Sequence, residues 1–553
     1  MVYRAASCAT DPFDQDTQKP VAWQKQGSII VTDSKKAPTA QGTTSLKLGS
    51  AVQMLPIVAG YSVQLVCTPY IVARLGLHDF GIWAITGAIV QYGALLDLGA
   101  SRATVRYVAL FHTQGDAKSE GGALTLCITM LLALWAFLSG VAVLAAHPTS
   151  RLLGLSDPAL TRSLLLSSVA ILFLGLLGWV LTAASIGIGR VVPTTVGLAI
   201  LSVLQASGGV AGLALNPSLT TFAYGSVAGS ALGFAVVLII KLAGERRIPF
   251  AMPTLALTRE FFGYAVTSQI AAAADTLVLQ SGKLIAGLMI GPSAAGVYEL
   301  ANRLAMGAQV LGSASASTLT PHLTQSYISG GMDGVLHQYE HLVRRNTSVS
   351  LIFPFSMAAT AISAITVWLG HDRQQVIVVL LALLIGIAVN LSTAICSCTL
   401  SAIGRPAVIA KVSVATGVFQ TIAAVAATYF WGFAGLAGAI AIGVPIAKFL
   451  GLYYMHAKLD IPLNLYTRGV LGPFAAAGAA TVAALPFNFL VATDDRRSAI
   501  LPFCASATVF FATYLFIGWR RGYLPAVTLP SKWLQAFKGD ELLRRTRRYF
   551  DHS

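Results

Sequence analysis

Long apolar stretches alternate with short polar segments along most of the chain. From Gly49 onward, apolar segments of about 20 residues recur, and this is the length that a helix needs to cross the hydrocarbon core of a bilayer. The pattern predicts an all-α, polytopic membrane protein with about fourteen transmembrane helices. The expected spans are 49–72, 80–99, 121–145, 163–186, 192–214, 222–243, 263–287, 296–320, 347–369, 376–399, 407–430, 433–455, 469–490 and 499–518.

The composition excludes a water-soluble fold of this size. Only 11% of the 553 residues are charged, against roughly 25% in a typical soluble domain. The net charge of +15 would suggest a nucleic-acid partner in a soluble protein. No basic patch interleaved with aromatic residues is present, so we expect no nucleic-acid binding and interpret the excess as basic cytoplasmic loops.

The distribution of Lys and Arg predicts the orientation. If the N-terminus is cytoplasmic, 26 of the 37 basic residues fall in cytoplasmic segments, 6 fall in outward loops and 5 lie within the spans. A miscounted span would disturb this alternation, so the asymmetry favours both the helix count and cytoplasmic N- and C-termini.

The chain contains an internal repeat, in which position 75 corresponds to position 290. Leu-Gly-x4-Gly-x-Trp at 75–83 returns as Ile-Gly-x4-Gly-x-Tyr at 290–298, and at the same offset Ile-Gly-Arg at 188–190 returns at 403–405. An even number of helices keeps both copies in the same orientation, so we expect two parallel six-helix repeats. The organisation that follows is a disordered cytoplasmic N-tail (1–48), an N-lobe with helices 1–6 (49–243), a cytoplasmic linker (244–262), a C-lobe with helices 7–12 (263–455), an appended helix pair (469–518) and a basic amphipathic cytoplasmic tail (519–553).

Charged residues inside the spans are the candidates for function. Membrane proteins built from parallel repeats typically transport a substrate bound near the middle of the bilayer, and a charge at the centre of a span costs about 2.5–3.5 kcal/mol on insertion scales. Lys283, Arg303 and Asn302 are candidate substrate-binding residues, and Asp275 and Glu299 are candidates for coupling to an ion. A polar stripe continues from Asn302 along the same helix face, as expected for the wall of a cavity, through Gln309, Ser313, Ser317 and Thr320. Gln309 is the fourth candidate for substrate binding.

Structural explanations stay open for these residues. Glu299 and Arg303 could form an i,i+4 ion pair, Lys283 could pair with Asp275, and the stripe could hydrogen-bond neighbouring helices.

A further cluster lies at the inner end of the second span. Asp97 is followed by Arg102 and Arg106, which suggests a gate closed by ion pairing or, alternatively, a helix cap with basic flanking residues. The sequence contains no phosphate-binding loop and no nucleophile elbow, and its six cysteines lie mostly in apolar runs. We therefore expect no enzymatic activity, no cofactor and no metal.

Two segments resemble a known family. Arg74–Gly81 with Asp97–Arg106, and Ala274–Leu304 with its Gly-Pro-x3-Gly-x-Tyr-x2-Ala-x-Arg-Leu motif, are similar to prokaryotic polysaccharide transporters, the lipid-linked oligosaccharide flippases of the multidrug/oligosaccharidyl-lipid/polysaccharide (MOP) exporter superfamily. The resemblance implies two lobes around a central, usually cationic cavity in the inner membrane. It also implies a polyprenyl-pyrophosphate-linked glycan as substrate, flipped to the outer leaflet by alternating access, and a polysaccharide polymerase or chain-length machinery as partner.

Two other functions stay open from the sequence. An ion-coupled small-molecule or multidrug antiporter of the same architecture predicts an acidic cavity. A membrane-embedded glycan polymerase or ligase predicts a large outward loop, whereas the longest expected outward loops, 146–162 and 491–498, are short.

Overall fold

The computed structural model describes residues 55–93, 95, 99–245, 250–255, 257–261, 276, 280–317, 319–370, 374–488 and 496–523. These residues belong to one compact unit, Ala51–Ser553. The predicted N-tail 1–48 and the tail beyond residue 523 lie outside the described residues.

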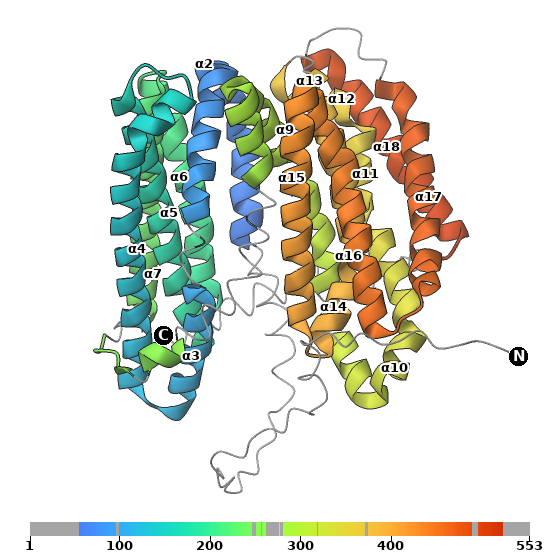
Figure 1. Cartoon of the computed structure of the whole chain (residues 1–553), viewed down its shortest axis with the longest axis horizontal. Helices are drawn as coiled ribbons and strands as arrows, with labels where there is room; N and C mark the ends of the chain where they lie inside the picture. The colour runs from blue at the N-terminus through green and yellow to red at the C-terminus, as the bar shows by residue number, and fades with distance from the viewer. Residues whose placement is uncertain are drawn as a thin grey trace, which may run out of the picture. The chain divides into compact units, whose positions relative to one another are not determined.

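All regular elements in these ranges are helices, which confirms the all-α prediction (Figure 1). The first half contains α2 (Leu55–Gly93), α3 (Ala100–Gln114), α4 (Ala117–Leu152), α5 (Pro158–Gly187), α6 (Val192–Leu215) and α7 (Leu219–Glu245). The second half contains η2 (Ala286–Ile290), α9 (Pro292–Ser317), α10 (Leu319–Ser350), α11 (Ile352–Ala359), α12 (Ala361–Leu369), α13 (Gln374–Ser392), α14 (Ala394–Ala402), α15 (Pro406–Gly438), η3 (Ala439–Gly443), α16 (Val444–Leu459), α17 (Leu463–Asn488) and α18 (Arg496–Arg520).

The helices agree with the predicted spans when each helical segment that contains two spans is counted as two. Within the described residues, nine helices are long and apolar enough to cross a membrane, or up to ten if a bent pair is counted as one span. Two of the nine contain two predicted spans each, because non-helical residues interrupt the helical path at Gly76 in α2 and at Gly432 in α15. The bent pair Pro292–Ala359 and Ala361–Leu369 covers the eighth and ninth predicted spans. The seventh predicted span is described only at residue 276 and from residue 280 onward.

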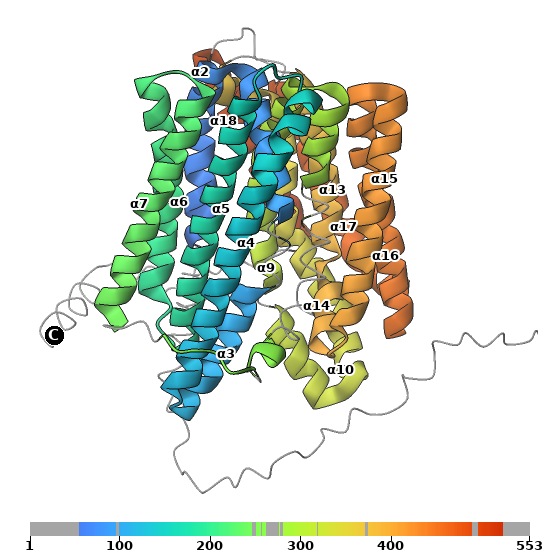
Figure 2. The same cartoon turned by 60° about the vertical axis from the view of Figure 1, so that its left-hand side comes forward.

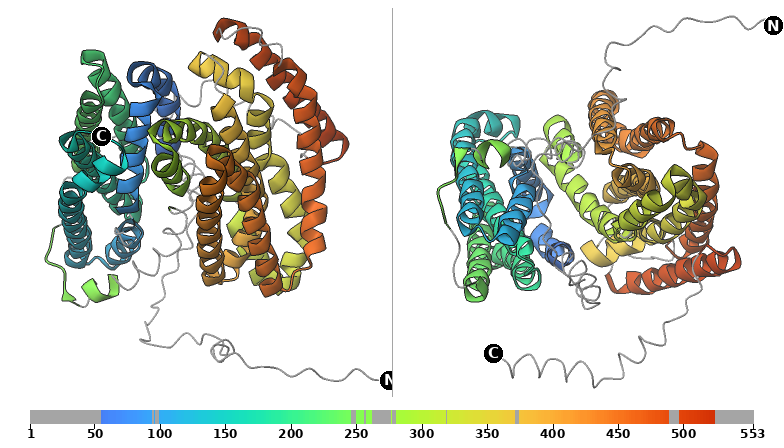
Figure 3. Two further views of the ribbon diagram at one scale, coloured as in Figure 1. Left: turned by 45° about the horizontal axis from the view of Figure 1, so that its top comes forward. Right: turned by 90° about the horizontal axis from the view of Figure 1, so that it is seen from below.

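The helices of each half pack mainly on one another. In the first half α6 lies along α7, and α4 lies against α5. In the second half α9 packs on α13, and α15 packs on α16, which lies beside it in Figure 2. α17 and α18 pack together at the side of α10, α11 and α12 (Figure 3). The two halves meet where α2 contacts α9.

The repeat found in the sequence has matching backbone geometry. Gly189 and Gly404 adopt φ values of 82° and 76°, a left-handed conformation that glycine takes without a steric cost. The arginine that follows each glycine then donates a hydrogen bond to a carbonyl at or near the end of the sixth helix of its repeat. Arg190 donates to Gly244 of α7, and Arg405 donates to Lys458 of α16 at 3.2 Å.

The repeated glycines at the motif centre bring the halves into contact. A Cβ atom added at Gly81 on α2 would collide with the backbone carbonyl of Pro292, and one added at Gly296 on α9 would collide with the carbonyl of Leu77. Equivalent positions of the two copies therefore pack against each other, with backbones close enough that only glycine fits.

The ninth predicted span is not one continuous helix. The helical path breaks at Thr360, between α11 and α12. Asn488 of α17 fills the break: its Nδ2 donates to the Ala359 carbonyl, and its Oδ1 accepts from the backbone N–H of Ser363 at 3.2 Å. These two backbone groups would pair with each other in an unbroken helix, so the asparagine replaces the lost bond.

The predicted linker 244–262 is partly integrated into the first half. Leu257 and Phe261 are buried in the core formed by α3, α4 and α5, and the Phe261 ring lies 5.5 Å from the Tyr107 ring. The described part of this segment therefore packs as a part of the first half.

We predict that Asn488→Leu destabilises the protein. The substitution leaves the Ala359 carbonyl and the Ser363 N–H without partners in a water-poor interior, at a cost of about 1–3 kcal/mol. Thermal melting of the detergent-purified protein should show a lower Tm. Asn464→Leu, an exposed position at the start of the same helix, is the matched control. Equal melting temperatures for the two variants would contradict the role assigned to Asn488.

Candidate functional site

A cavity of about 340 Å³ lies between the two halves. We call it the first cavity; its walls come from α2, α5, α6, the segment before η2, and α9. Its described charged residues are Lys283, Glu299 and Arg303. The amide and hydroxyl side chains around them are Tyr61, Gln64, Gln91, Ser168, Gln205, Gln280 and Asn302.

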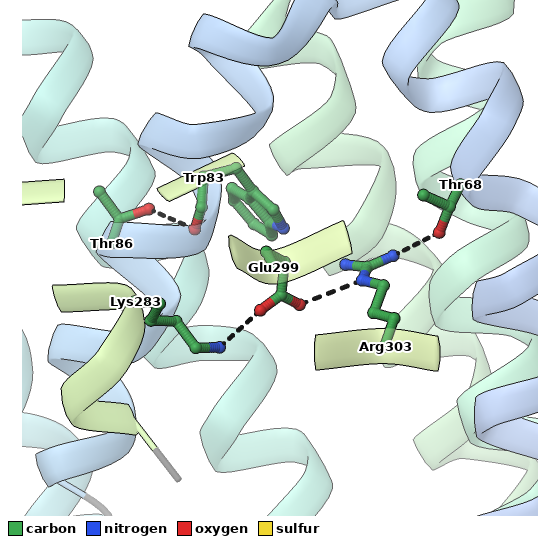
Figure 4. Close-up of polar contacts among 6 residues, drawn as sticks. All are labelled: Thr68, Trp83, Thr86, Lys283, Glu299 and Arg303. Atoms are coloured by element: carbon green, nitrogen blue, oxygen red, sulfur yellow. Dashed lines mark hydrogen bonds and ion pairs between the residues drawn. The ribbon is translucent and has the colours of Figure 1, made fainter. Parts of the chain in front are cut away.

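The three charged residues form a continuous ion-pair cluster (Figure 4). Lys283 Nζ lies 2.8 Å from Glu299 Oε2, and Arg303 Nε lies 3.0 Å from Glu299 Oε1. The two cations thus approach the carboxylate from opposite sides. Arg303 also donates from Nη1 to the Thr68 hydroxyl at 2.7 Å, which links the cluster to α2 in the first half.

The helices explain this arrangement. Glu299 and Arg303 are one turn apart on α9, the spacing at which side chains on one helix face meet. Lys283 precedes the π-helical turn η2, a helix irregularity that is frequent at functional sites. Thr68 and Lys283 occupy corresponding positions of the two repeats, so equivalent residues of the two copies flank the Glu299–Arg303 pair.

The cluster carries one excess positive charge in a largely desolvated place. The side chains of Lys283 and Glu299 are each 12% exposed, and that of Arg303 is 13% exposed. The Arg303 guanidinium also lies 5.0 Å from the Phe80 ring centre. Burying three charges costs free energy that mutual attraction only partly offsets, so an intramembrane cluster of this kind marks a candidate functional site.

The structure shows one of the alternatives for these charges. Glu299 and Arg303 do form the i,i+4 pair, but Lys283 joins the same carboxylate. Asp275 lies outside the described residues, as does Asp97 of the predicted gate. Arg102 and Arg106 lie on α3, and Arg106 is exposed, with its guanidinium 5.5 Å from the Tyr107 ring centre.

The residues of the predicted polar stripe lie in different surroundings. Asn302 lines the first cavity and also a second one of about 360 Å³. Gln309 lines the second cavity only. The Ser313 hydroxyl donates to the Val310 carbonyl of its own helix, and Thr320 lies beyond the end of α9, on α10. The side chain of Ser317 is not described.

The second cavity contains residues that the sequence analysis missed. Its walls come from α9, α13, α15, η3 and α16. Gln309 of α9 and Asn390 of α13 line it, together with four residues that the sequence analysis did not single out: Ser413, Thr416, Gln420 and Lys448. The internal repeat could have indicated Gln420, because this residue is the equivalent of Gln205, which lines the first cavity.

The helical architecture, with an ion-pair cluster buried among apolar helices long enough to cross a bilayer, defines a polytopic membrane protein. The chain belongs to the family described as polysaccharide biosynthesis protein, which residues 46–327 match.

Individual proteins agree with this assignment. The chain is 24% identical over 469 residues to the uncharacterized membrane protein EpsK of Bacillus subtilis (strain 168), and the match covers 81% of this chain and 90% of EpsK. Two solved structures share the fold, each at 15% identity. An inward-facing multidrug resistance MATE family transporter of the MOP superfamily has a TM-score of 0.61, and the match covers 75% of this chain and 97% of that protein. The lipid II flippase MurJ, in an inward closed conformation, has a TM-score of 0.59, with 85% and 98% covered.

We predict that neutralising the members of the cluster has unequal effects on stability. Glu299→Gln leaves two buried cations without their counter-ion and should cost about 3–5 kcal/mol. Lys283→Met leaves a balanced Glu299–Arg303 pair and should change stability by less than about 1 kcal/mol. Adding Lys283→Met to Glu299→Gln should restore part of the loss. Thermal melting followed by tryptophan fluorescence measures all three variants, and a Lys283→Met protein as unstable as Glu299→Gln would contradict the cluster geometry.

Proposed function

We propose that this transporter flips a polyprenyl-pyrophosphate-linked oligosaccharide from the cytoplasmic to the outer leaflet of the inner membrane during the synthesis of a surface polysaccharide. The excess positive charge of the Lys283–Glu299–Arg303 cluster is the observation that carries this proposal. The family match to polysaccharide biosynthesis proteins supports the substrate class.

The chemistry of the substrate explains why fixed cations are needed. A pyrophosphate cannot cross hydrocarbon unpaired, because transferring an isolated ion into an apolar medium is prohibitive. In the proposed cycle the phosphate oxygens displace the Glu299 carboxylate from Lys283 and Arg303. The guanidinium of Arg303 is suited to bidentate contact with phosphate, and Asn302 lies on the same cavity wall.

Alternating access follows from the duplicated architecture. We propose that the lobes 49–243 and 263–455 rock against each other about the contact between Gly81 and Gly296, which exposes the first cavity to one leaflet at a time. Asp97, Arg102 and Arg106 are proposed as an inner gate. Both termini are cytoplasmic in this proposal, in agreement with the distribution of basic residues.

The acidic residues provide a route for ion coupling. A proton on Glu299 would weaken its hold on the two cations and free them for phosphate. Asp275 is the second acidic group proposed for coupling. A polysaccharide polymerase or the chain-length machinery would then receive the flipped glycan on the outer side.

The charge of the cavity argues against the alternative, an ion-coupled small-molecule or multidrug antiporter. That function predicts an acidic cavity, whereas the described charges of the first cavity are two basic and one acidic.

We predict that Lys283→Met and Arg303→Met each strongly reduce polysaccharide export. Each removes a charge-assisted hydrogen bond to phosphate worth about 1.5–3 kcal/mol, which corresponds to a loss of about tenfold or more in transport. Surface polysaccharide is measured in a deletion strain that expresses each variant.

Lys411→Met is the matched control, because Lys411 is exposed at the start of α15 and its replacement should leave export unchanged. Immunoblots of membranes and size-exclusion profiles show whether each variant is folded. Normal export by both folded variants would remove Lys283 and Arg303 from the mechanism.

A further inference from the structure

The walls of the two cavities correspond in part. Several wall positions of the second cavity correspond, by the repeat offset, to wall positions of the first. Three such pairs are Trp83 and Tyr298, Leu172 and Ile387, and Gln205 and Gln420. The first-half wall of the first cavity therefore matches part of the wall of the second cavity. The first cavity also has a wall from the second half, and this wall carries its charged residues.

The last two helices of the repeat pack differently in the two halves, and this difference provides part of the wall of the second cavity. In the first half, Gly225, Gly229 and Gly233 let α7 approach α6 so closely that an added Cβ atom would meet the backbone of α6 at each position. The equivalent residues of the second half are Ile440, Val444 and Lys448. Their side chains prevent the same close approach, and all three line the second cavity.

The lining of the second cavity suits a ligand that both donates and accepts hydrogen bonds. Amides and hydroxyls dominate its polar groups, and an amide offers both kinds of partner. Gln420 is only 9% exposed, and its Oε1 has no hydrogen-bond partner among the described residues. Such a buried, unsatisfied acceptor costs free energy until a donor reaches it.

Two further features point to a binding site. Ile440 belongs to the π-helical turn η3, and π-helical turns are frequent at functional sites. The volume of about 360 Å³ lies within the range of small-ligand sites, roughly 300–1,000 Å³. Asn302 and Met306 line both cavities, so a ligand in the second cavity would sit next to the ion-pair cluster.

We propose that the second cavity is a sugar-binding subsite, in which Gln420 and Asn390 hydrogen-bond the hydroxyl groups of the sugar unit nearest the pyrophosphate. Hydroxyl groups supply the donor that Gln420 Oε1 lacks, and the apolar side chains of Ile387 and Val444 can pack against the sugar ring. This inference rests on the proposed function. It divides recognition between the two cavities: the cluster binds the phosphate, and the second cavity binds the sugar.

The test measures sugar binding separately from transport. Saturation-transfer NMR is recorded on the detergent-purified full chain with glucose, galactose, N-acetylglucosamine and N-acetylgalactosamine. Binding of inorganic pyrophosphate is measured in parallel by calorimetry. At least one sugar should bind, and Gln420→Leu and Asn390→Leu should each weaken it by about threefold to tenfold, the factor expected for one lost neutral hydrogen bond.

Two controls make the result specific. Gln205→Leu, at the equivalent position of the first cavity, should keep the sugar signal. Pyrophosphate should still bind to Gln420→Leu but not to Lys283→Met. The two sugar-site variants lie on different helices, so misfolding of one, detected by size exclusion, leaves the other as a test.

The possible outcomes separate this inference from the function on which it rests. The subsite is overturned if none of the four sugars binds the wild-type protein, or if neither folded variant weakens binding. Loss of export in Lys283→Met with unchanged sugar binding in Gln420→Leu and Asn390→Leu would keep the flippase and reject the subsite. Variant-sensitive sugar binding with no transport of a lipid-linked glycan would support the subsite and reject the flippase.

Discussion

One carboxylate, Glu299, is held between two cations, Lys283 and Arg303, in the interior of a membrane protein. Removing the carboxylate leaves two buried positive charges, whereas removing Lys283 leaves a neutral pair. The loss of Glu299 should therefore destabilise the protein more than the loss of Lys283. Arg303 carries the interaction across the boundary between the halves through its bond to Thr68. A ligand anion that replaces Glu299 would therefore alter both the charge balance of the cavity and a contact between the halves.

The cluster lies in a fold that consists of two repeats of the same helical unit. The two copies share the hydrogen bonds donated by Arg190 and Arg405 and the left-handed glycines that precede these arginines. They also share several positions in the cavity walls. Substitutions at equivalent positions then gave the cavities different chemistry. Glu299 stands where the first copy has Ala84, and both residues line the first cavity. Lys448 stands where the first copy has Gly233, and it lines the second cavity. The charged cluster and the proposed sugar site can thus lie next to each other in one helical framework.

Much of the fold was predictable because membrane insertion imposes a length and a hydropathy on every span. The internal repeat also predicted which turns would match. The break at Thr360 was not predictable, because the bond that compensates it comes from Asn488, far away in sequence. For the site, the sequence singled out Lys283, Glu299 and Arg303, but it could not assign the partner of Lys283. Lys448 and Gln420 were missed because a single polar residue in an apolar helix does not reveal whether it faces lipid, a neighbouring helix or a cavity.

The central claim is that Lys283 and Arg303 exchange Glu299 for the phosphate of a lipid-linked glycan. The most direct test is translocation in proteoliposomes of two fluorescent polyprenyl glycolipids that differ only in the presence of the pyrophosphate. The account predicts that the wild-type protein moves the pyrophosphate-linked lipid much faster than the neutral one, and that Lys283→Met loses this preference. Equal rates for the two lipids with the wild-type protein, or an unchanged preference in Lys283→Met, would contradict it.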